Sequence, residues 1–293
     1  MENILTENNN PATCNIDLME TAEIVSTINQ EDFKVAEAVQ KALPEIEKAV
    51  DIISTAFLQD GRLAYFGAGT SGRLGVLDAS ECWPTFSAPD GMITGYIAGG
   101  DYALRHSIEG AEDNKEEALK HLNEFNPTNK DVIVGISASG NPQYVLTILE
   151  EAKKRGTKTI GITSNPEAKL NRIADITITT VVGPEVITGS SRMKSGTAQK
   201  MVLNMLSTAS MIKIGKTYGN YMIDLQLACN KLINRGNRII SSICQIPVEK
   251  AEEYRIKADN NIKTACVMYL KQCSKDEAEK LLQHHNGILR KVI

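Results

Sequence analysis

The sequence has no long apolar run, and its first residues do not predict an export signal. None of its apolar stretches approaches the roughly 18 residues that a membrane-spanning helix needs. Residues 1–10 lack the basic and apolar regions of a signal peptide. The sequence therefore predicts a soluble, cytoplasmic protein with no membrane partner.

Neither charge sign dominates, and aromatic residues are few. The 293 residues include 32 Lys and Arg against 36 Asp and Glu, and no basic stripe is interleaved with aromatic residues. A nucleic-acid surface needs such a basic footprint. The composition therefore argues against a nucleic-acid partner.

The six cysteines and four histidines form no recognisable metal or redox motif. No two cysteines stand in a Cys-x-x-Cys pair, and His284 and His285 would diverge by about 100° on a helix, which makes a shared ion difficult. Cys266 and Cys273 are seven residues apart, which predicts that they pack on one helix face. We expect free thiols, no metal and no cofactor.

The pattern of apolar residues divides the chain into three regions. Residues 1–54 are interpreted as a polar arm and helices, with Asp17 placed to cap the first helix and Pro44 to begin the last. Residues 55–218 alternate β-branched runs with helical patterns. Residues 219–293 hold no convincing strand and are interpreted as a small helical domain. The helices expected in the first region lie near 18–28, 31–43 and 44–59.

The alternation in the middle region predicts a doubly wound α/β fold with a five-stranded parallel sheet. Continuous apolar runs such as Val132-Ile133-Val134 are typical of strands covered by helices on both faces. The expected strands lie near 62–66, 92–97, 131–136, 158–162 and 176–181, and the expected helices near 72–81, 102–123, 142–155 and 191–214.

Three loops rich in Gly, Ser and Thr directly follow expected strands. They comprise residues 67–72, 137–140 and 163–165. At the carboxyl ends of parallel strands, such loops open onto the ligand crevice, and their small residues let backbone N–H groups approach a ligand. The hydroxyl groups add neutral donors. These loops therefore predict a pocket for a phosphate monoester.

The first loop also matches the dinucleotide pattern G-x-G-x-x-G, at Gly67, Gly69 and Gly72. That pattern requires an acidic residue about 20 positions further on, at the end of the second strand. Asp78 falls within a helix instead, and Asp101 comes late. A dinucleotide-dependent oxidoreductase is therefore a weaker alternative than phosphate binding.

Two glutamates near these loops are candidates for acid–base chemistry. Glu81 precedes Cys82-Trp83-Pro84, where the helix is expected to stop in an apolar setting that would raise the pKa of its carboxyl. Glu112 has Glu109 and Asp113 as neighbours, and their charges would also raise its pKa. Spacing alone does not single out this pair, because most of the 36 acidic residues are expected on the solvated surface.

Residues 183–197 form a Gly/Ser/Thr-rich linker that leads into a helix N-terminus. Such a terminus favours anions, which makes Glu185, Ser190 and Ser191 candidate ligand contacts. Two basic residues in the segment either add charge to that site or are solvated beside the helix. The sequence leaves both interpretations open.

Several long strings of residues carry a resemblance to a known family. They are Leu5-Thr6-Glu7, Asn10-Pro11, the string from Gly67 to Glu81, the string from Glu109 to Asn114, and three strings between Gly183 and Lys200. Together they cover nearly the whole chain. The chain resembles the N-acetylmuramic acid 6-phosphate etherases, lyases of the sugar isomerase (SIS) domain superfamily that act in cell-wall amino sugar recycling.

This resemblance implies cleavage of the ether between D-lactate and the sugar, giving N-acetylglucosamine 6-phosphate without a metal or redox cofactor. The family's catalytic pair matches Glu81, the acid that assists lactate departure, and Glu112, the base that takes the C2 hydrogen. Substrate contacts are expected at Gly69, Thr70, Ser71, Ser137, Ser139, Glu185, Ser190 and Ser191.

The chain departs from the family pattern after the second loop. Asn141-Pro142-Gln143 follows Gly140, where the family usually has Arg-Thr-Pro. The loss of an Arg and a Thr beside the phosphate loop would lower affinity or alter the sugar accepted. Neither expected catalytic glutamate is affected.

Two other functions fit the same loops. A non-catalytic sugar-phosphate sensor that regulates a partner protein would keep the hydroxyl loops but dispense with the acid–base pair, so the two glutamates favour the enzyme. An aldose–ketose isomerase shares proton transfer at C2, and lactate release distinguishes the two reactions. SIS domains typically pair, and the N-terminal arm has little core of its own, so we expect a homodimer whose sites are completed at the interface.

Overall fold

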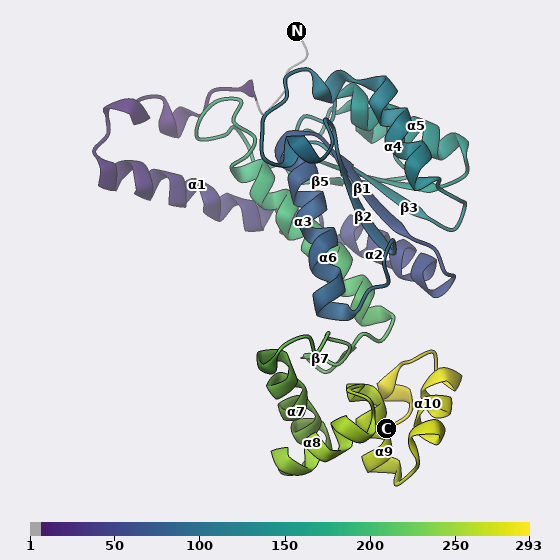
Figure 1. The fold of residues 1–293 in the computed structure, drawn as a ribbon. Coiled ribbons are helices and arrows are strands. Elements are labelled where there is room, and N and C mark those ends of the chain that lie inside the picture. The colour runs from purple at the N-terminus through teal and green to yellow at the C-terminus, as the bar shows by residue number, and fades with distance from the viewer. Residues whose placement is uncertain (1–6) are drawn as a thin grey trace. The chain divides into compact units, whose positions relative to one another are not determined.

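A computed structural model describes residues 7–293 (Figure 1), and these residues divide into two compact units. The first unit comprises the chain up to Ser80 and Gly91–Thr208, and the second comprises Glu81–Asp90 and Ala209–Ile293. Thr6, which the resemblance places in the N-terminal arm, lies outside the described residues.

The first unit is built on a five-stranded parallel sheet, as the sequence predicts. Its strands are β1 (Leu63–Gly67), β2 (Ile93–Ile97), β3 (Val132–Ile136), β4 (Lys158–Thr163) and β5 (Ile176–Thr179). They lie in the order β2-β1-β3-β4-β5, with Gly67 opposite both Ile97 and Ile136. The order reverses between β1 and β3, and ligands bind at such a switch point in parallel α/β sheets.

Helices cover both faces of this sheet, which confirms the doubly wound fold. The helices of the first unit are α1 (Thr21–Lys41), α2 (Leu43–Leu58), α3 (Gly69–Phe86), α4 (Lys115–Phe125), α5 (Gln143–Lys154) and α6 (Lys194–Lys213), of which α3 and α6 end in the second unit. On one face, α4 and α5 pack around Phe66 and Ile133. On the other face, a Cβ added at Gly75 of α3 would lie 2.9 Å from Cβ of Tyr65, and the Tyr65 hydroxyl donates to Asp78 of the same helix.

Two expected helices have other bounds than predicted. The segment expected as one helix over 102–123 forms the short 3-10 turns η4 (Asp101–Leu104) and η5 (Ala111–Asp113) before α4. Gly110 adopts a left-handed conformation there, and the Asn114 side chain caps α4 by accepting from the backbone N–H of Glu117 at 3.0 Å. Helix α3 does not stop before Pro84 but continues to Phe86. In this last turn, Pro84 forfeits a single helical hydrogen bond.

The N-terminal arm is held to the rest of the first unit by polar contacts. Asp17 does not cap the first helix but lies in a 3-10 turn, and α1 begins at Thr21 behind a capping box of Glu20 and Glu23. Helix α1 then runs without interruption over the two helices expected near 18–28 and 31–43. The Asn10 amide donates to Glu31 of α1 and to the Pro184 carbonyl, at 2.9 and 3.2 Å.

A buried ion pair ties α1 to α6 within the first unit. Lys194 Nζ lies 2.6 Å from Glu31 Oε2, and their side chains are 1% and 4% exposed. Burial raises the pKa of Glu31, but hydrogen bonds from Lys194, Lys34 and Asn10 outweigh it and lower the pKa to about 2. The arm therefore depends on a carboxylate that stays ionised.

The second unit is helical around its own apolar core. Its helices are α7 (Asn230–Cys244), α8 (Val248–Lys257), α9 (Ile262–Lys271) and α10 (Lys275–His284), and the Ser274 side chain caps α10. The hairpin of β6 (Thr217–Tyr218) and β7 (Tyr221–Met222) was not expected, because two-residue strands leave no detectable alternation.

The cysteines are free thiols, and Cys266 and Cys273 pack on the same core, but not from one helix face as predicted. Cys266 lies in α9, which ends at Lys271, whereas Cys273 lies beyond the C-cap residue Gln272. The two therefore do not share a helix face. Cys266 instead hydrogen-bonds with the thiol of Cys244 in the core of the second unit.

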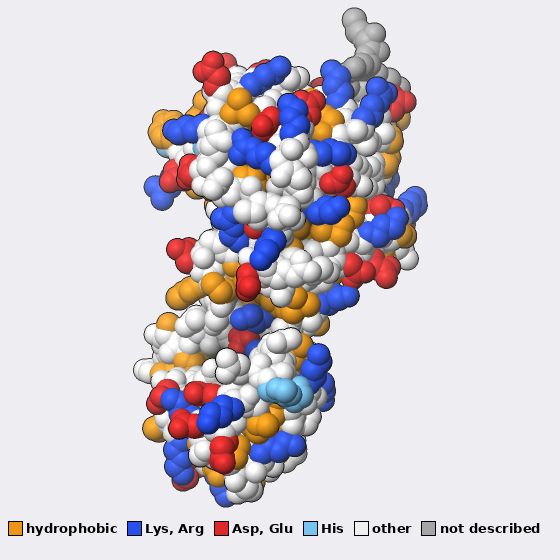
Figure 2. All heavy atoms as spheres, turned by 90° about the vertical axis from the view of Figure 1, so that its right-hand side faces the viewer, with side chains coloured by type: hydrophobic (Ala, Val, Ile, Leu, Met, Phe, Trp, Pro, Cys, Tyr) orange, Lys and Arg blue, Asp and Glu red, His pale blue; other side chains and the backbone are white. Residues whose placement is uncertain are grey.

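Acidic and basic side chains are interspersed on the face drawn in Figure 2. Over residues 7–293, no helix combines the length and apolar character required to cross a bilayer.

The Glu31–Lys194 pair generates a stability prediction. Replacing Lys194 by Met leaves a buried carboxylate without its main partner, which is expected to lower the free energy of unfolding by about 3–5 kcal/mol. Lys34→Met is the matched control, because Lys34 bonds the other oxygen of the same carboxylate but is 54% exposed. That change should cost less than about 1 kcal/mol. Urea unfolding followed by circular dichroism measures both.

The pH dependence of this pair follows from the lowered pKa. The pKa of Glu31 is about 2 in the folded chain against 4.5 as the ordinary value, so its stabilising contribution is present above pH 4.5 and is lost as the pH falls toward 2. The Lys194→Met variant should lose less stability over that range than the parent chain. Equal losses in the two lysine variants would contradict this account.

Candidate functional site

A tight junction between β1 and α3 forms the first side of the site. A Cβ on Gly67 would lie 2.7 Å from the backbone nitrogen of Gly72, and a Cβ on Gly72 would lie 2.6 Å from the Gly67 carbonyl oxygen. Gly69 has a φ of +52°, a left-handed conformation that glycine adopts at little cost. The glycine pattern is therefore explained by backbone packing, which turns residues 68–71 toward the carboxyl ends of the strands.

The loop after β3 forms the second side of the site. The backbone N–H of Gly140 donates to Ser137 Oγ at 3.0 Å, and Gly140 has a φ of +70°. Thr163, the last residue of β4, and Asn165, from the loop after it, donate to the carbonyls of Ala138 and Ser139 at 3.0 and 3.2 Å. The loop after β4 was expected to open onto the ligand, but it is buried and braces the second loop from behind.

These two loops enclose a cavity of about 270 Å³ at the switch point of the sheet. Seven predicted site residues line it: Gly69, Thr70, Ser71, Glu112, Ser137, Ser139 and Ser191. Glu7 and Gly189 also line it, and no Lys or Arg is found among the described residues that do so. The cavity thus offers hydroxyl groups and backbone N–H groups as neutral donors.

The hydroxyl donors differ in their availability to a ligand. The hydroxyls of Thr70 and Ser139 have no hydrogen-bond partner within residues 7–293. The Ser71 hydroxyl donates to Gln199 Oε1 at 2.9 Å, whereas Gln199 Nε2 is buried and unpaired among the described residues. With this amide turned by 180°, Gln199 donates to Ser71 and frees the Ser71 proton for the cavity.

Glu112 lies where this cavity meets a second cavity of about 360 Å³. The left-handed Gly110 begins turn η5, which carries the side chain to that position. Partial desolvation raises the pKa of Glu112, and the negative charge of Asp113 raises it further. A carboxylate with a raised pKa is a stronger base, which suits proton abstraction.

Three predicted site residues lie elsewhere. Glu185 is fully buried, and its two oxygens accept the backbone N–H groups of Lys194 and Ser195 at 2.9 Å each, which caps α6. Ser190 is half-buried and does not line the cavity, unlike its neighbour Ser191. Glu81 lies on α3 in the stretch that belongs to the second unit, and it is exposed rather than set among apolar side chains.

Sequence reasoning did not assign Glu7 to the site. A Cβ on Gly189 would lie 3.0 Å from Glu7 Oε2, so the arm reaches the cavity beside this glycine. One signal in the sequence could have found it, because Glu7 belongs to the string Leu5-Thr6-Glu7, which is part of the family resemblance.

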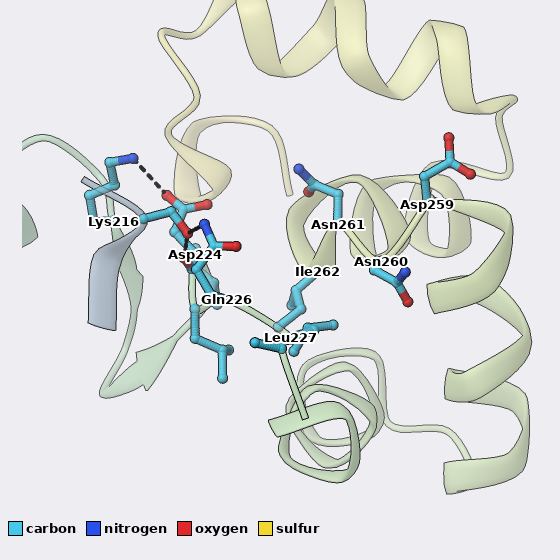
Figure 3. Close-up of a pocket in the computed structure, with 12 residues that line it drawn as sticks. Lys216, Asp224, Gln226, Leu227, Asp259, Asn260, Asn261 and Ile262 are labelled. Carbon is cyan, nitrogen blue, oxygen red and sulfur yellow. Dashed lines mark hydrogen bonds and ion pairs between the residues drawn. The ribbon is translucent and has the colours of Figure 1, made fainter. Parts of the chain in front are cut away.

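A larger cavity of about 510 Å³ lies within the second unit (Figure 3). Asp224 in its wall is paired with Lys216 at 3.5 Å and with Lys263 at 2.5 Å, so its charge is neutralised locally. None of the predicted site residues lines this cavity. Over residues 7–293, no three His, Cys, Asp or Glu side chains are grouped as metal ligands. We therefore place the candidate site at the sheet.

Comparisons with known proteins match the chain to two domain families and to relatives of similar length. Residues 34–153 match the glucokinase regulatory protein N-terminal SIS domain family, and residues 112–209 match the SIS domain family. The whole chain is 52% identical to 96% of an N-acetylmuramic acid 6-phosphate etherase from Actinobacillus pleuropneumoniae, and 48% identical to 98% of one from Escherichia coli O1:K1.

The chain belongs to the N-acetylmuramic acid 6-phosphate etherase family. Among solved structures, a phosphoheptose isomerase from Francisella tularensis matches 66% of this chain and 100% of its own with a TM-score of 0.51. Its sequence identity is 15%, so it supports the fold alone.

The residues that follow Gly140 in this member of the etherase family have two roles in the second loop. Asn141 accepts the backbone N–H of Lys169 at 3.1 Å through its side chain, which fixes the loop, and Pro142 lines the hydroxyl-lined cavity. Gln143 begins α5. The pyrrolidine ring of Pro142 therefore forms an apolar wall on this side of the cavity.

The hydroxyl groups of the cavity generate a binding prediction. Ser139→Ala removes a neutral donor to a phosphate and is expected to weaken N-acetylglucosamine 6-phosphate binding about 10- to 100-fold, because hydrogen bonds to charged groups contribute about 1.5–3 kcal/mol. Ser242→Ala, at an exposed position of α7, should leave the affinity unchanged. Isothermal titration calorimetry measures both, and equal affinities would remove Ser139 from the site.

Proposed function

We propose that the protein cleaves the D-lactyl ether of N-acetylmuramic acid 6-phosphate, giving N-acetylglucosamine 6-phosphate and D-lactate. The observation that carries the proposal is the position of Glu112, a base with a raised pKa, at the edge of a cavity lined by neutral hydroxyl donors. Relatives of about half identity over the full chain bear the name of this activity.

The reaction begins at C2 of the open-chain sugar. Glu112 takes the C2 proton, and the electron pair is stabilised by the adjacent aldehyde as an enolate. The enolate then expels the oxygen at C3, to which Glu81 transfers a proton, so that D-lactate leaves. Water adds to the resulting double bond, with hydroxyl at C3 and hydrogen at C2. The phosphate is held meanwhile by the loops after β1 and β3.

We further propose that Glu81 is supplied by a second copy of the chain in a homodimer. Glu81 is exposed on its own chain, and Leu77, four residues earlier on the same face of α3, is exposed as well. The arm also carries exposed apolar side chains, including Phe33 at 71% exposure and Val25 of α1. Exposed large apolar side chains on α1 and on α3 are of the kind that another chain covers in an assembly.

A non-catalytic sensor is the second candidate, favoured by the match of residues 34–153 to the glucokinase regulatory protein N-terminal SIS domain family. Incubation with N-acetylmuramic acid 6-phosphate, with D-lactate measured enzymatically, separates the two functions. Tight binding of the sugar phosphate with no lactate above an enzyme-free control would establish the sensor.

The roles of the two glutamates can be separated by isotope exchange. Glu112→Gln should abolish both lactate release and exchange of the C2 hydrogen with deuterated solvent, because no base is left. Glu81→Gln should lose lactate release but retain exchange at C2, since proton abstraction precedes elimination. NMR of the sugar and a lactate assay measure the two steps. Exchange surviving in Glu112→Gln but not in Glu81→Gln would reverse the assignment.

The shared site predicts complementation between inactive variants. Mixed Glu81→Ala and Glu112→Ala chains should regain about a quarter of the parent activity, because half of the dimers are mixed and each holds one intact site. Unmixed variants serve as controls. If both glutamates acted in one chain, no mixture would recover activity, and a monomer in analytical ultracentrifugation would exclude the dimer.

A further inference from the structure

The second cavity beside Glu112 differs in charge from the hydroxyl-lined cavity. Ala68, Gly69 and Glu112 line both, but only the second cavity is lined by Arg73 and His106. The two spaces therefore adjoin at the proposed base, with neutral donors on one side and Arg73 and His106 on the other, where the carboxylate of Glu109 also lines the wall.

Arg73 is held by hydrogen bonds to three backbone carbonyls. Its Nε donates to the Leu104 carbonyl at 3.1 Å, and its Nη2 donates to the carbonyls of Ala103 and His106 at 2.7 and 3.0 Å. Within residues 7–293 it forms no ion pair, and its Nη1 has no hydrogen-bond partner. A fixed guanidinium with two unused N–H groups is suited to a carboxylate.

His106 lines the same cavity, and its Nε2 can donate to a ligand only when both ring nitrogens carry protons, because Nδ1 faces a carbonyl. The imidazole stacks on the Tyr102 ring, with centroids 4.0 Å apart and planes 12° from parallel. Its Nδ1 lies 3.3 Å from the Tyr102 carbonyl oxygen, which favours a proton on that nitrogen. The ring is thereby oriented by its own turn of chain, independently of Arg73.

We propose that this cavity binds the carboxylate of the lactyl ether, with Arg73 as the ligand that selects it and His106 as a lesser contact. The proposal rests on the proposed function. The substrate carries two anionic groups, the phosphate at C6 and the lactyl carboxylate attached through C3, and the base acts at C2 next to the ether. A sugar lying across Glu112 places the phosphate among the hydroxyl groups and the lactyl group beside Arg73. An acetamido group needs no cation, so the charge of Arg73 favours the lactyl end.

The test compares N-acetylmuramic acid 6-phosphate with its lactyl carboxamide, which has the same shape but no charge. The kcat/KM of the parent chain should be about 10- to 100-fold higher for the carboxylate than for the carboxamide, which is the effect expected of one charge-assisted hydrogen-bonded pair. In Arg73→Gln the preference should fall close to 1, and in His106→Gln it should fall partially. Inhibition by D-lactate should weaken in Arg73→Gln, while inhibition by N-acetylglucosamine 6-phosphate persists.

Arg105→Gln is the matched control, because Arg105 lies in the same segment, is exposed and does not line the cavity. It should leave the substrate preference unchanged. If Arg73 served only to hold residues 103–106, Arg73→Gln would slow both substrates equally and the preference would persist, which overturns the proposal.

Failure of the subsite and failure of the proposed function give different results. A parent chain that cleaves both substrates equally well, releasing lactate from one and lactamide from the other, overturns the subsite without any variant. If the parent chain releases no lactate at all, the etherase function fails, and calorimetric affinities for the two compounds then decide the subsite. Should Arg73→Gln not fold, His106→Gln supplies the same comparison, since Arg73 bonds only the backbone of His106.

Discussion

The backbone contact between Gly67 and Gly72 determines the arrangement of the whole site. Neither position tolerates a Cβ, so β1 and the first turn of α3 meet directly. The chain between them must then turn outward, which presents Thr70 and Ser71 at the carboxyl ends of β1 and β3. Arg73, the next residue, is directed to the segment from η4 to η5, whose carbonyls it holds. One steric condition thereby fixes the environment on both sides of Glu112.

The arm and the linker before α6 depend on a second constraint, the buried Glu31–Lys194 pair. Lys194 joins Glu31 through its side chain and Glu185 through its backbone N–H, so one residue connects the arm, the linker and the start of α6. Asn10 adds hydrogen bonds to Glu31 and to the Pro184 carbonyl. These contacts hold Gly189 and Ser191 against the cavity and bring Glu7 to its edge.

The sheet could be predicted from the sequence because its strands are continuous apolar runs separated by helical periods. The loops after β1 and β3 could be placed for the same reason, since parallel topology brings strand ends together. Glu185 shows where such reasoning stops. A carboxylate in an anion-friendly linker looks like a ligand contact, but folding uses it to cap α6, and spacing does not distinguish the two uses. The loop after β4 was misjudged similarly, because hydroxyl groups that brace a neighbouring loop have the same composition as those that face a ligand.

The separation of charge around Glu112 connects the fold with the proposed chemistry. A cation among the phosphate ligands would lower the pKa of Glu112 and weaken it as a base. Hydroxyl and backbone donors bind a phosphate without that effect, and the carboxyl keeps a raised pKa beside Asp113. Arg73 is a cation near the same carboxyl, but three backbone carbonyls direct their negative ends at its Nε and Nη2. Its remaining N–H groups can bind a carboxylate, while these carbonyl dipoles weaken the effect of its positive charge on the pKa of Glu112. Glu112 must keep a raised pKa although the substrate carries an anionic group on each side of it. Neutral donors bind one of these anions, and Arg73, whose charge is partly compensated by backbone carbonyls, binds the other.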